Sequence, residues 1–254
     1  MKNAIPIYIG FDSTQRIASQ VCEFSILKRT SIPVMTQHLA LGGVMRNGMY
    51  ARPSWIENGQ RHDFRDGKPF STDFSFSRFL VPHLSMFDGW AIFCDGDFLF
   101  LDDIAELVSQ ADPKYAAMVV KHKHNPANEP KRKMDGRLQT AYRRKNWSSL
   151  VLWNCSHPAH RDLTIDAVNR ESGQWLHAFS WLNDEQIGEL PARWNHLVGV
   201  NEPIDNPAGV HFTLGGPWLE QHSKTPFANE WREEHRSYWN AHYPGVQPEV
   251  FAAA

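Results

Sequence analysis

The sequence has few of the features that mark membrane, secreted or nucleic-acid-binding proteins. It holds three cysteines in 254 residues, without metal-site spacing, and no apolar run of the roughly 18 residues that predict a membrane-spanning helix. Its start, MKNAIPIYIGFDS, lacks the apolar stretch and cleavage site of a signal peptide. A net charge of −2 and a pI near 6.7 exclude a general attraction to nucleic acid or anionic membranes. We therefore expect a cytoplasmic protein with reduced thiols, no nucleic-acid partner and no integral membrane segment.

Short apolar runs alternate with amphipathic segments along the first half of the chain. An apolar run that ends in a polar turn is typical of a buried strand, and apolar residues at helical spacing indicate a helix. The predicted strands are IPIYIGFD, IPVMTQHL, WAIFCD, YAAMVVKH and SSLVLWN, and the predicted helices cover residues 15–29, 74–84 and 102–110. Ser13 or Thr14 is expected to cap the first helix. The alternation predicts an α/β fold with a mostly parallel central sheet and helices on both faces.

Three segments do not follow this alternation. Residues 42–72 are rich in Gly, Pro, Asn and charge and show no period, so we predict a long loop. Residues 122–146 are basic and turn-rich with few apolar anchors, which predicts a mobile lid over a bound ligand. Residues 225–245 carry charges of both signs and predict a helix packed on the same single domain, which spans residues 1–254.

The segment FCDGDFLF places two carboxylates directly after a predicted buried strand. In open α/β sheets, ligands bind beyond the carboxyl ends of the strands. In an extended chain Asp95 and Asp97 point to the same side, and Gly96 lets the backbone turn tightly between them. Like charges this close repel each other unless a cation neutralises them, and oxygen ligands favour Mg²⁺, Ca²⁺ or Mn²⁺. The pattern alone also fits a turn with two solvated carboxylates, so both interpretations stay open.

Several segments together resemble the family-eight glycosyltransferases, the glycogenin-like and lipopolysaccharide galactosyltransferase-like enzymes. The block FSFSRFLVPHLSMFDGWAIFCDGDFLFLDDI is similar to the family pattern of an Arg-bearing helix, a Pro, a strand that ends in Asp-x-Asp and an acidic helix start. IYIGFDST resembles the first strand of these enzymes, and VHFTLGGPW resembles their C-terminal block. NWSSLVLWN and WLNDEQIGELP match more loosely. The resemblance covers most of residues 5–218.

This resemblance implies a single catalytic domain of the GT-A (nucleotide-diphospho-sugar transferase) fold. The implied activity is metal-dependent transfer of a sugar from a nucleotide diphosphate sugar, a UDP-sugar by analogy, to an acceptor with retention of anomeric configuration. A divalent cation would neutralise the leaving diphosphate. Asp95, Asp97 and His211 would hold that cation, and an imidazole ligand favours Mn²⁺ over Mg²⁺. His211 alone also fits a partly buried histidine at a strand end.

The resemblance also implies a donor site around the first strand and the Arg-bearing helix. Gly10 would admit the flat base, and Asp12 and Thr14 would lie beside it, although Asp12 equally fits a residue that caps the next helix. Arg78 would pair with a phosphate or hold an Asp of the metal motif. Its neighbours are apolar, which argues against an ordinary surface arginine.

This chain departs from the family pattern at one informative place. The C-terminal block usually carries a Lys before Pro-Trp that contacts the diphosphate, whereas Gly216 precedes Pro217 here. The backbone N–H groups of Gly215 and Gly216 are expected to form an anion-binding nest instead. The missing positive charge would come from one of five basic residues: Lys121, Lys123, Arg143, Arg144 or Lys145.

The segment WLNDEQIG corresponds to the acidic loop that lies on the acceptor side in the family. Its Asp184 and Glu185 would lie near the reacting sugar carbon and stabilise positive charge that develops there. The tryptophans of the second half would stack on sugar rings or pack in the core. A nucleotidyltransferase of similar fold stays an alternative, although GFDSTQR lacks the Gly-rich phosphate loop of those enzymes. The second alternative is a non-catalytic protein that binds nucleotide sugars or carbohydrates.

Overall fold

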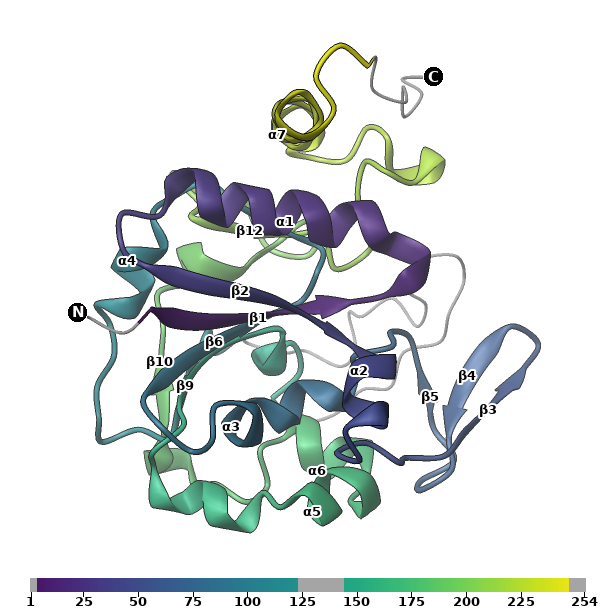
Figure 1. Cartoon of the computed structure of the whole chain (residues 1–254), viewed down its shortest axis with the longest axis vertical. Helices are drawn as coiled ribbons and strands as arrows, with labels where there is room; N and C mark the ends of the chain where they lie inside the picture. Colours follow the sequence, from purple (N-terminus) through teal and green to yellow (C-terminus); the bar gives the residue numbers. More distant parts are fainter. Residues whose placement is uncertain (1–3, 123–143, 247–254) are drawn as a thin grey trace.

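The computed structural model describes residues 4–122 and 144–246, and a six-stranded sheet lies at its centre (Figure 1). Its strands, in the order β10-β8-β9-β6-β1-β2, are β1 Ile5–Phe11, β2 Val34–Ala40, β6 Trp90–Cys94, β8 Ala117–Val119, β9 Leu150–Asn154 and β10 Ile187–Glu189. The pairs β1–β2, β1–β6 and β8–β10 are parallel, and β9 is antiparallel to β6 and β8. The predicted mostly parallel sheet is therefore confirmed.

Helices cover both faces of the central sheet, as predicted (Figure 1). They are α1 Arg16–Arg29 and α4 Ile104–Val108 on one face, and α3 Val81–Leu84, α5 Ile165–Arg170 and α6 Gly173–His177 on the other. The alternation of side chains along each strand creates the two faces. In β1, Ile7 and Ile9 pack in the cluster with α1 and α4, whereas Tyr8 packs in the cluster with α3, α5 and α6.

A second sheet lies beside the central one and brings the C-terminal half of the chain to the Asp-Gly-Asp segment. It consists of β7 Phe98–Phe100, β12 Gly209–His211 and β11 His196–Leu197. Strands β7 and β12 are antiparallel, and His211 pairs with Phe98. Because Phe98 directly follows Asp97, this register places His211 next to the two carboxylates.

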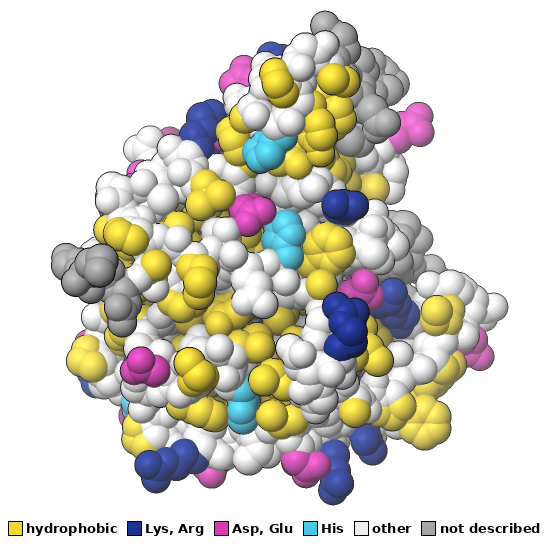
Figure 2. Space-filling view, viewed as in Figure 1, with side chains coloured by type: hydrophobic (Ala, Val, Ile, Leu, Met, Phe, Trp, Pro, Cys, Tyr) yellow, Lys and Arg dark blue, Asp and Glu magenta, His cyan; other side chains and the backbone are white. Residues whose placement is uncertain are grey.

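The predicted long loop over residues 42–72 is wrong, because this segment contains regular structure. It holds α2 Leu41–Arg46 and a three-stranded sheet of β3 Ser54–Glu57, β4 Gln60–Asp63 and β5 Pro69–Phe70. Asn58 and Gly59 connect β3 to β4 with φ of 50° and 76°. An Asn-Gly pair with positive φ at both residues is the usual two-residue hairpin turn. The hairpin protrudes at the right of Figure 1, and hydrophobic side chains lie on the same part of the surface in Figure 2.

The predicted C-terminal helix is present as α7 Ala228–His242 and packs on α1. Arg29 of α1 donates a hydrogen bond to the buried Glu234 at 2.6 Å, and Phe24 contacts Tyr238 edge-to-face at 5.8 Å. The predicted lid lies outside the described residues except at its two ends. No described helix is both long and apolar enough to cross a membrane. The three cysteines are buried free thiols, as expected of small hydrophobic residues.

Candidate metal and donor site

The turn between β6 and β7 holds both carboxylates of the Asp-Gly-Asp segment. Asp95 is 7% exposed and its N–H donates to the Ser149 carbonyl at 2.8 Å, so the turn is fixed to the start of β9. A Cβ atom on Gly96 would lie 2.2 Å from the Gly10 carbonyl oxygen. The end of β1 passes so close to position 96 that only glycine fits there. The sequence had suggested the tight turn as the reason for this glycine.

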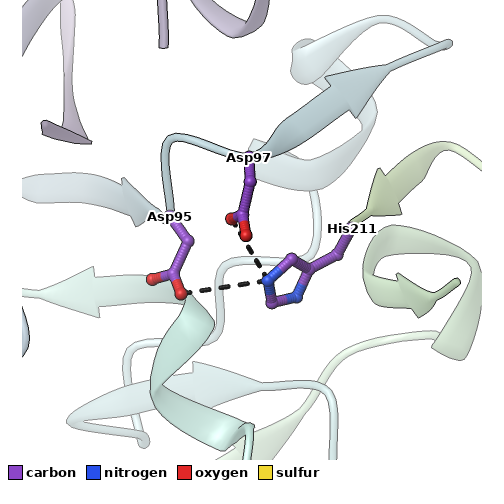
Figure 3. Close-up of side chains that lie close together, drawn as sticks. All are labelled: Asp95, Asp97 and His211. Carbon is purple, nitrogen blue, oxygen red and sulfur yellow. Dashed lines mark ion pairs between the residues drawn. The ribbon is translucent and has the colours of Figure 1, made fainter. Parts of the chain in front are cut away.

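His211 lies against both carboxylates (Figure 3). Its Nε2 atom is 3.3 Å from Asp97 Oδ1 and 3.9 Å from Asp95 Oδ2. One ligand atom from each residue lies within 4.8 Å of the other two. The predicted set of two carboxylates and one imidazole is therefore assembled by the fold from segments more than 110 positions apart in the sequence.

Asn195 orients the His211 ring. His211 Nδ1 and Asn195 Oδ1 are 3.1 Å apart, so the carboxamide oxygen accepts the Nδ1 proton. Asn195 is fully buried and donates from Nδ2 to Ser149 Oγ at 2.9 Å. The Nε2 atom then carries the lone pair, is buried, and has no hydrogen-bond partner among the described residues. Such an orphaned acceptor beside two carboxylates fits a divalent cation, and the Asn195 contact is the outer-shell partner that metal-binding histidines usually have.

Arg78 holds Asp95 from the opposite side. It lies in the 3-10 helix η2 Ser77–Leu80, is 5% exposed and donates from Nη1 to Asp95 Oδ1 at 2.6 Å and to the Ser148 carbonyl at 3.0 Å. Its guanidinium carbon lies 5.1 Å from the ring centres of Phe74 and Phe93. The predicted pairing of Arg78 with an aspartate of the metal motif is confirmed. Its alternative role with a phosphate stays a prediction.

A small pocket beside Asp97 contains two of the three residues that the sequence assigned to the nucleotide base. Gly10, Asp12 and Asp97 line it together with Phe74. The Phe74 ring covers Gly10, because a Cβ atom there would lie 2.6 Å from it. Thr14 does not line this pocket and instead donates to Asp12 Oδ1 at 2.6 Å.

Asp12 has a structural role that the sequence had left open. Its Oδ1 accepts the Thr14 N–H at 2.9 Å and caps the 3-10 helix η1 Ser13–Gln15, which leads into α1. Its Oδ2 accepts the Asp73 N–H at 3.2 Å and ties the segment after β5 to the end of β1. The cap is thus Asp12, and the expected capping by Ser13 or Thr14 is wrong. Contact of Asp12 with a base stays a prediction.

The predicted anion nest of two glycine N–H groups is wrong for Gly215. Its N–H donates to the Phe212 carbonyl at 2.8 Å and is therefore used within the chain. Its φ of +120° and the approach of the His222 ring, 2.5 Å from a would-be Cβ, explain why glycine stands there. A Cβ atom at position 216 would likewise lie 2.0 Å from the Trp218 ring, so Gly216 leaves room for this ring. These glycines serve close packing of the segment after β12.

The structure does not bring Asp184 and Glu185 into the metal cluster. They lie in the 3-10 helix η7 Asp184–Gln186 before β10, and both are exposed. Asp184 forms an ion pair with Arg144, which also donates to the Ala178 carbonyl at 2.5 Å. Their catalytic role stays a prediction.

Two further described basic residues border the chain segment that leads to Ser148 and Ser149. The Lys121 ammonium lies 5.8 Å from the ring centre of Trp147, and burial lowers the pKa of Lys145 to about 8. Lys123 and Arg143 lie outside the described residues. Of the tryptophans, Trp153 is fully buried and Trp218 is 9% exposed, so these two pack in the core.

Asn195, Ser148 and Ser149 are the site residues that sequence reasoning missed. Each of them forms a hydrogen bond, through a carbonyl, hydroxyl or carboxamide group, with a partner at least 16 positions away in the sequence. The segments RWNH and NWSSL contain no motif that predicts such contacts. Asp95 and Asp97 were accessible from the sequence because carboxylates directly after a buried strand are unusual, whereas His211 was assigned through the family resemblance.

Comparison with known proteins gives one close relative and several structures of the same fold. No model of a known protein family matches the sequence. Protein CDI of Arabidopsis thaliana is 45% identical over 242 residues, which cover 93% of this chain and 88% of that protein. Structures of several glycosyltransferases also superpose on the chain, and three of them are described next.

The galactosyltransferase LgtC, in complex with donor and acceptor sugar analogs, gives a TM-score of 0.55 at 12% identity, over 96% of this chain and 98% of LgtC. GlyE of Streptococcus pneumoniae gives 0.56 at 14% identity over 94% of this chain, and the bifunctional enzyme WbbM gives 0.58 at 12% identity over 92%. The chain spans 63% of GlyE and half of WbbM. These likenesses confirm the predicted GT-A fold.

Proposed function

The chain belongs to the same family as Protein CDI of Arabidopsis thaliana and has the fold of GT-A glycosyltransferases, and from these premises we propose that it is a metal-dependent glycosyltransferase. It transfers a sugar from a nucleotide diphosphate sugar, with a UDP-sugar as the first candidate, to an acceptor that carries a free hydroxyl group. Transfer proceeds with retention of anomeric configuration, as in the enzymes that the sequence resembles. We assign the protein to a reducing compartment, the cytoplasm, and its three unbonded thiols support this assignment.

One observation carries this proposal: the convergence of Asp95, Asp97 and the Asn195-oriented His211 at the carboxyl end of β6. Two carboxylates and an imidazole are a ligand set for Mn²⁺ or, less favourably, Mg²⁺. When bound there, the cation supplies Lewis-acid neutralisation of a diphosphate leaving group. LgtC forms a complex with donor and acceptor sugar analogs on the same fold, which supports a donor site in this chain.

The chain's own residues prepare this site before any ligand binds. Arg78 neutralises part of the carboxylate charge and keeps Asp95 in place, at 2.6 Å. Asn195 keeps the proton on the Nδ1 atom of His211 and the lone pair toward the carboxylates. Asp184 and Glu185 are assigned to the sugar side, where a carboxylate stabilises the positive charge that develops on the reacting carbon.

Isothermal titration with UDP-, GDP- and CDP-sugars, with and without Mn²⁺, tests the proposal. We expect one diphosphate sugar to bind only with the metal and to be hydrolysed slowly without acceptor, because water can enter an open acceptor site. Preference for a nucleoside triphosphate would instead indicate a nucleotidyltransferase. Metal-independent sugar binding without turnover would indicate a non-catalytic binding protein.

Variants of the cluster link any observed binding to this site. Asp95→Ala, Asp97→Ala and His211→Ala should each abolish Mn²⁺-dependent donor binding, because each removes one of three protein ligands. His62→Ala, a histidine on the protruding hairpin, serves as the control and should bind donor like the unmodified protein. Near-normal Mn²⁺ affinity in Asp97→Ala would overturn the metal assignment.

A further inference from the structure

A chain of hydrogen bonds connects the His211 ring to the turn before β9. The Ser149 hydroxyl donates to the Asn146 carbonyl at 2.7 Å, and Asn195 Nδ2 donates to Ser149 Oγ at 2.9 Å. Asn195 Oδ1 in turn lies 3.1 Å from His211 Nδ1. All three side chains are buried, so bulk water does not compete for their donors and acceptors.

The backbone carbonyl at one end fixes the direction of every hydrogen bond in this chain. A carbonyl oxygen only accepts, so the Ser149 hydroxyl proton points to Asn146. The Ser149 oxygen is then left as an acceptor and takes an N–H of the Asn195 carboxamide. The carboxamide therefore turns its oxygen to His211, and this oxygen requires a proton on Nδ1. The other ring nitrogen, Nε2, keeps its lone pair toward the two carboxylates.

The carboxylates alone would favour the opposite tautomer. His211 Nε2 lies 3.3 Å from Asp97 Oδ1 (Figure 3), and both negative charges would attract a proton on Nε2. Such a proton would occupy the lone pair that a cation needs. To reach this state, the Asn195 carboxamide has to flip and the Ser149 hydroxyl has to leave Asn146. The Asn146 carbonyl would then keep only the longer contact with the Ser149 N–H, at 3.4 Å.

We propose that Ser149 is a positioning residue that fixes the Nδ1-protonated tautomer of His211 through Asn195. Ser149 is the last residue of the 3-10 helix η5 Trp147–Ser149, and its carbonyl also accepts the Asp95 N–H at 2.8 Å. One residue thus aligns two of the three side chains of the cluster. The consequence for metal affinity rests on the proposed function, whereas the tautomer rests on the hydrogen bonds alone.

The tautomer is measured on the full chain without metal. In protein with ¹⁵N-labelled histidine, NMR distinguishes protonated from unprotonated ring nitrogens, and the signals that disappear in His211→Gln belong to His211. At about pH 8 we expect the proton on Nδ1 in the unmodified protein. Ser149→Ala should raise the Nε2-protonated fraction about tenfold, the effect of one buried hydrogen bond on an equilibrium.

Matched variants separate this role from a general loss of structure. Ser149→Ala should weaken Mn²⁺ binding about tenfold in calorimetry, whereas Ser149→Thr keeps the hydroxyl and should stay within a few-fold. The control is Ser25→Ala. Ser25 is also buried, donates to the Cys22 carbonyl at 2.7 Å and accepts the Phe100 N–H at 3.0 Å. Its loss removes comparable hydrogen bonds and should leave both the His211 tautomer and the Mn²⁺ affinity unchanged.

The outcomes distinguish the role of Ser149 from the proposed function. A proton on Nε2 in the unmodified protein, or an unchanged tautomer in Ser149→Ala, would overturn the proposal. Equal effects of Ser25→Ala and Ser149→Ala on the tautomer would also overturn it. The expected tautomer change, together with no metal-dependent donor binding by the unmodified protein, would leave the role of Ser149 standing and remove the proposed function.

Discussion

At the scale of single residues, Asn195 is the position that decides how His211 presents its lone pair. Asn195→Leu keeps the volume and removes the acceptor for the Nδ1 proton, so the ring can rotate or change tautomer. We expect Mn²⁺ affinity to fall about 10- to 100-fold, measured by calorimetry. Asn154→Leu is the matched control, since this buried asparagine donates to the Pro113 and Tyr115 carbonyls away from the cluster. Equal metal affinity in the two variants would refute an orienting role.

Gly96 and Gly43 differ in the space around them, so alanine substitutions at the two positions test whether the close packing at Gly96 is required. In Gly96→Ala the new methyl group meets the Gly10 carbonyl at 2.2 Å, and both atoms belong to rigid segments. We expect a loss of about 1–3 kcal/mol in the free energy of unfolding, together with loss of metal binding. Gly43→Ala in α2 meets nothing within 4 Å and should be neutral or stabilising by about 0.5–1 kcal/mol. Urea unfolding of both variants measures the difference.

The catalytic assignment of Asp184 and Glu185 is tested by turnover rather than by binding. Asp184→Asn and Glu185→Gln keep shape and remove charge. We expect at least one of them to lower turnover by about 10²–10³ while donor affinity changes by only a few-fold. Because Arg144 pairs with Asp184, loss of this ion pair must be distinguished from loss of catalysis, and Arg144→Gln provides that comparison. Full turnover in both carboxylate variants would exclude this turn from the reaction.

At the scale of elements, a buried ion pair contributes to the attachment of the β3-β4-β5 sheet to the domain. Arg52 donates to both oxygens of Asp63, at 2.9 and 2.5 Å, and to the Val168 carbonyl of α5 at 2.9 Å. Both side chains are 1% exposed, and the guanidinium carbon lies 4.2 Å from the ring centre of Phe76. The pair therefore connects β4, α5 and the segment that carries Arg78.

Breaking this pair on one side should be worse than removing it altogether. Asp63→Asn or Arg52→Met each leaves a buried group without its charge partner, and we expect a loss of about 3–5 kcal/mol in the free energy of unfolding. The double variant should cost less than either single variant, because it leaves no buried charge without its partner. Chemical denaturation of the unmodified protein, the two single variants and the double variant measures these losses. If the losses of the two single variants simply add in the double variant, the two residues act independently.

At the scale of the whole molecule, buried histidines make stability depend on pH. His160 is fully buried, and burial lowers its pKa from 6.5 to about 4. Between pH 6.5 and pH 4, the histidine binds a proton in the unfolded chain but not in the folded chain. The contribution of neutral His160 to the free energy of unfolding is therefore complete above about pH 6.5 and is lost as the pH falls toward 4. Burial also lowers the pKa of His122 and of four other described histidines, in the same direction: His157, His196, His222 and His235.

We therefore expect the free energy of unfolding to fall between about pH 7 and pH 5, by about 2 kcal/mol from His160 alone. His160→Gln keeps a donor for the Ala116 carbonyl, which lies 2.9 Å from Nε2, and removes the titrating group. Its stability should change less over the same pH interval, as measured by urea unfolding at several pH values. An identical pH slope in both proteins would show that other groups dominate.

The sequence by itself determined the class of fold and the chemical elements of the site. Apolar runs that end in polar turns are local signals, and they identified the strands around Asp95 and the helix of residues 16–29. Asp95 and Asp97 at the end of a predicted strand left a metal site and a solvated turn both open, and the family resemblance added His211 and so predicted a metal-binding cluster. The sequence also contained the Asn58–Gly59 turn signal that would have corrected the prediction of a long loop.

Only the tertiary structure decided which atoms meet. The pairing of His211 with Phe98 sets the 3.3 Å approach of Nε2 to Asp97, and the burial of Asn195 selects the tautomer. The same packing uses the Gly215 N–H within the chain and gives Asp12 the helix cap. These contacts join positions that are far apart in the chain, and their free energy depends on distance, direction and exclusion of water, none of which a local pattern of residues encodes.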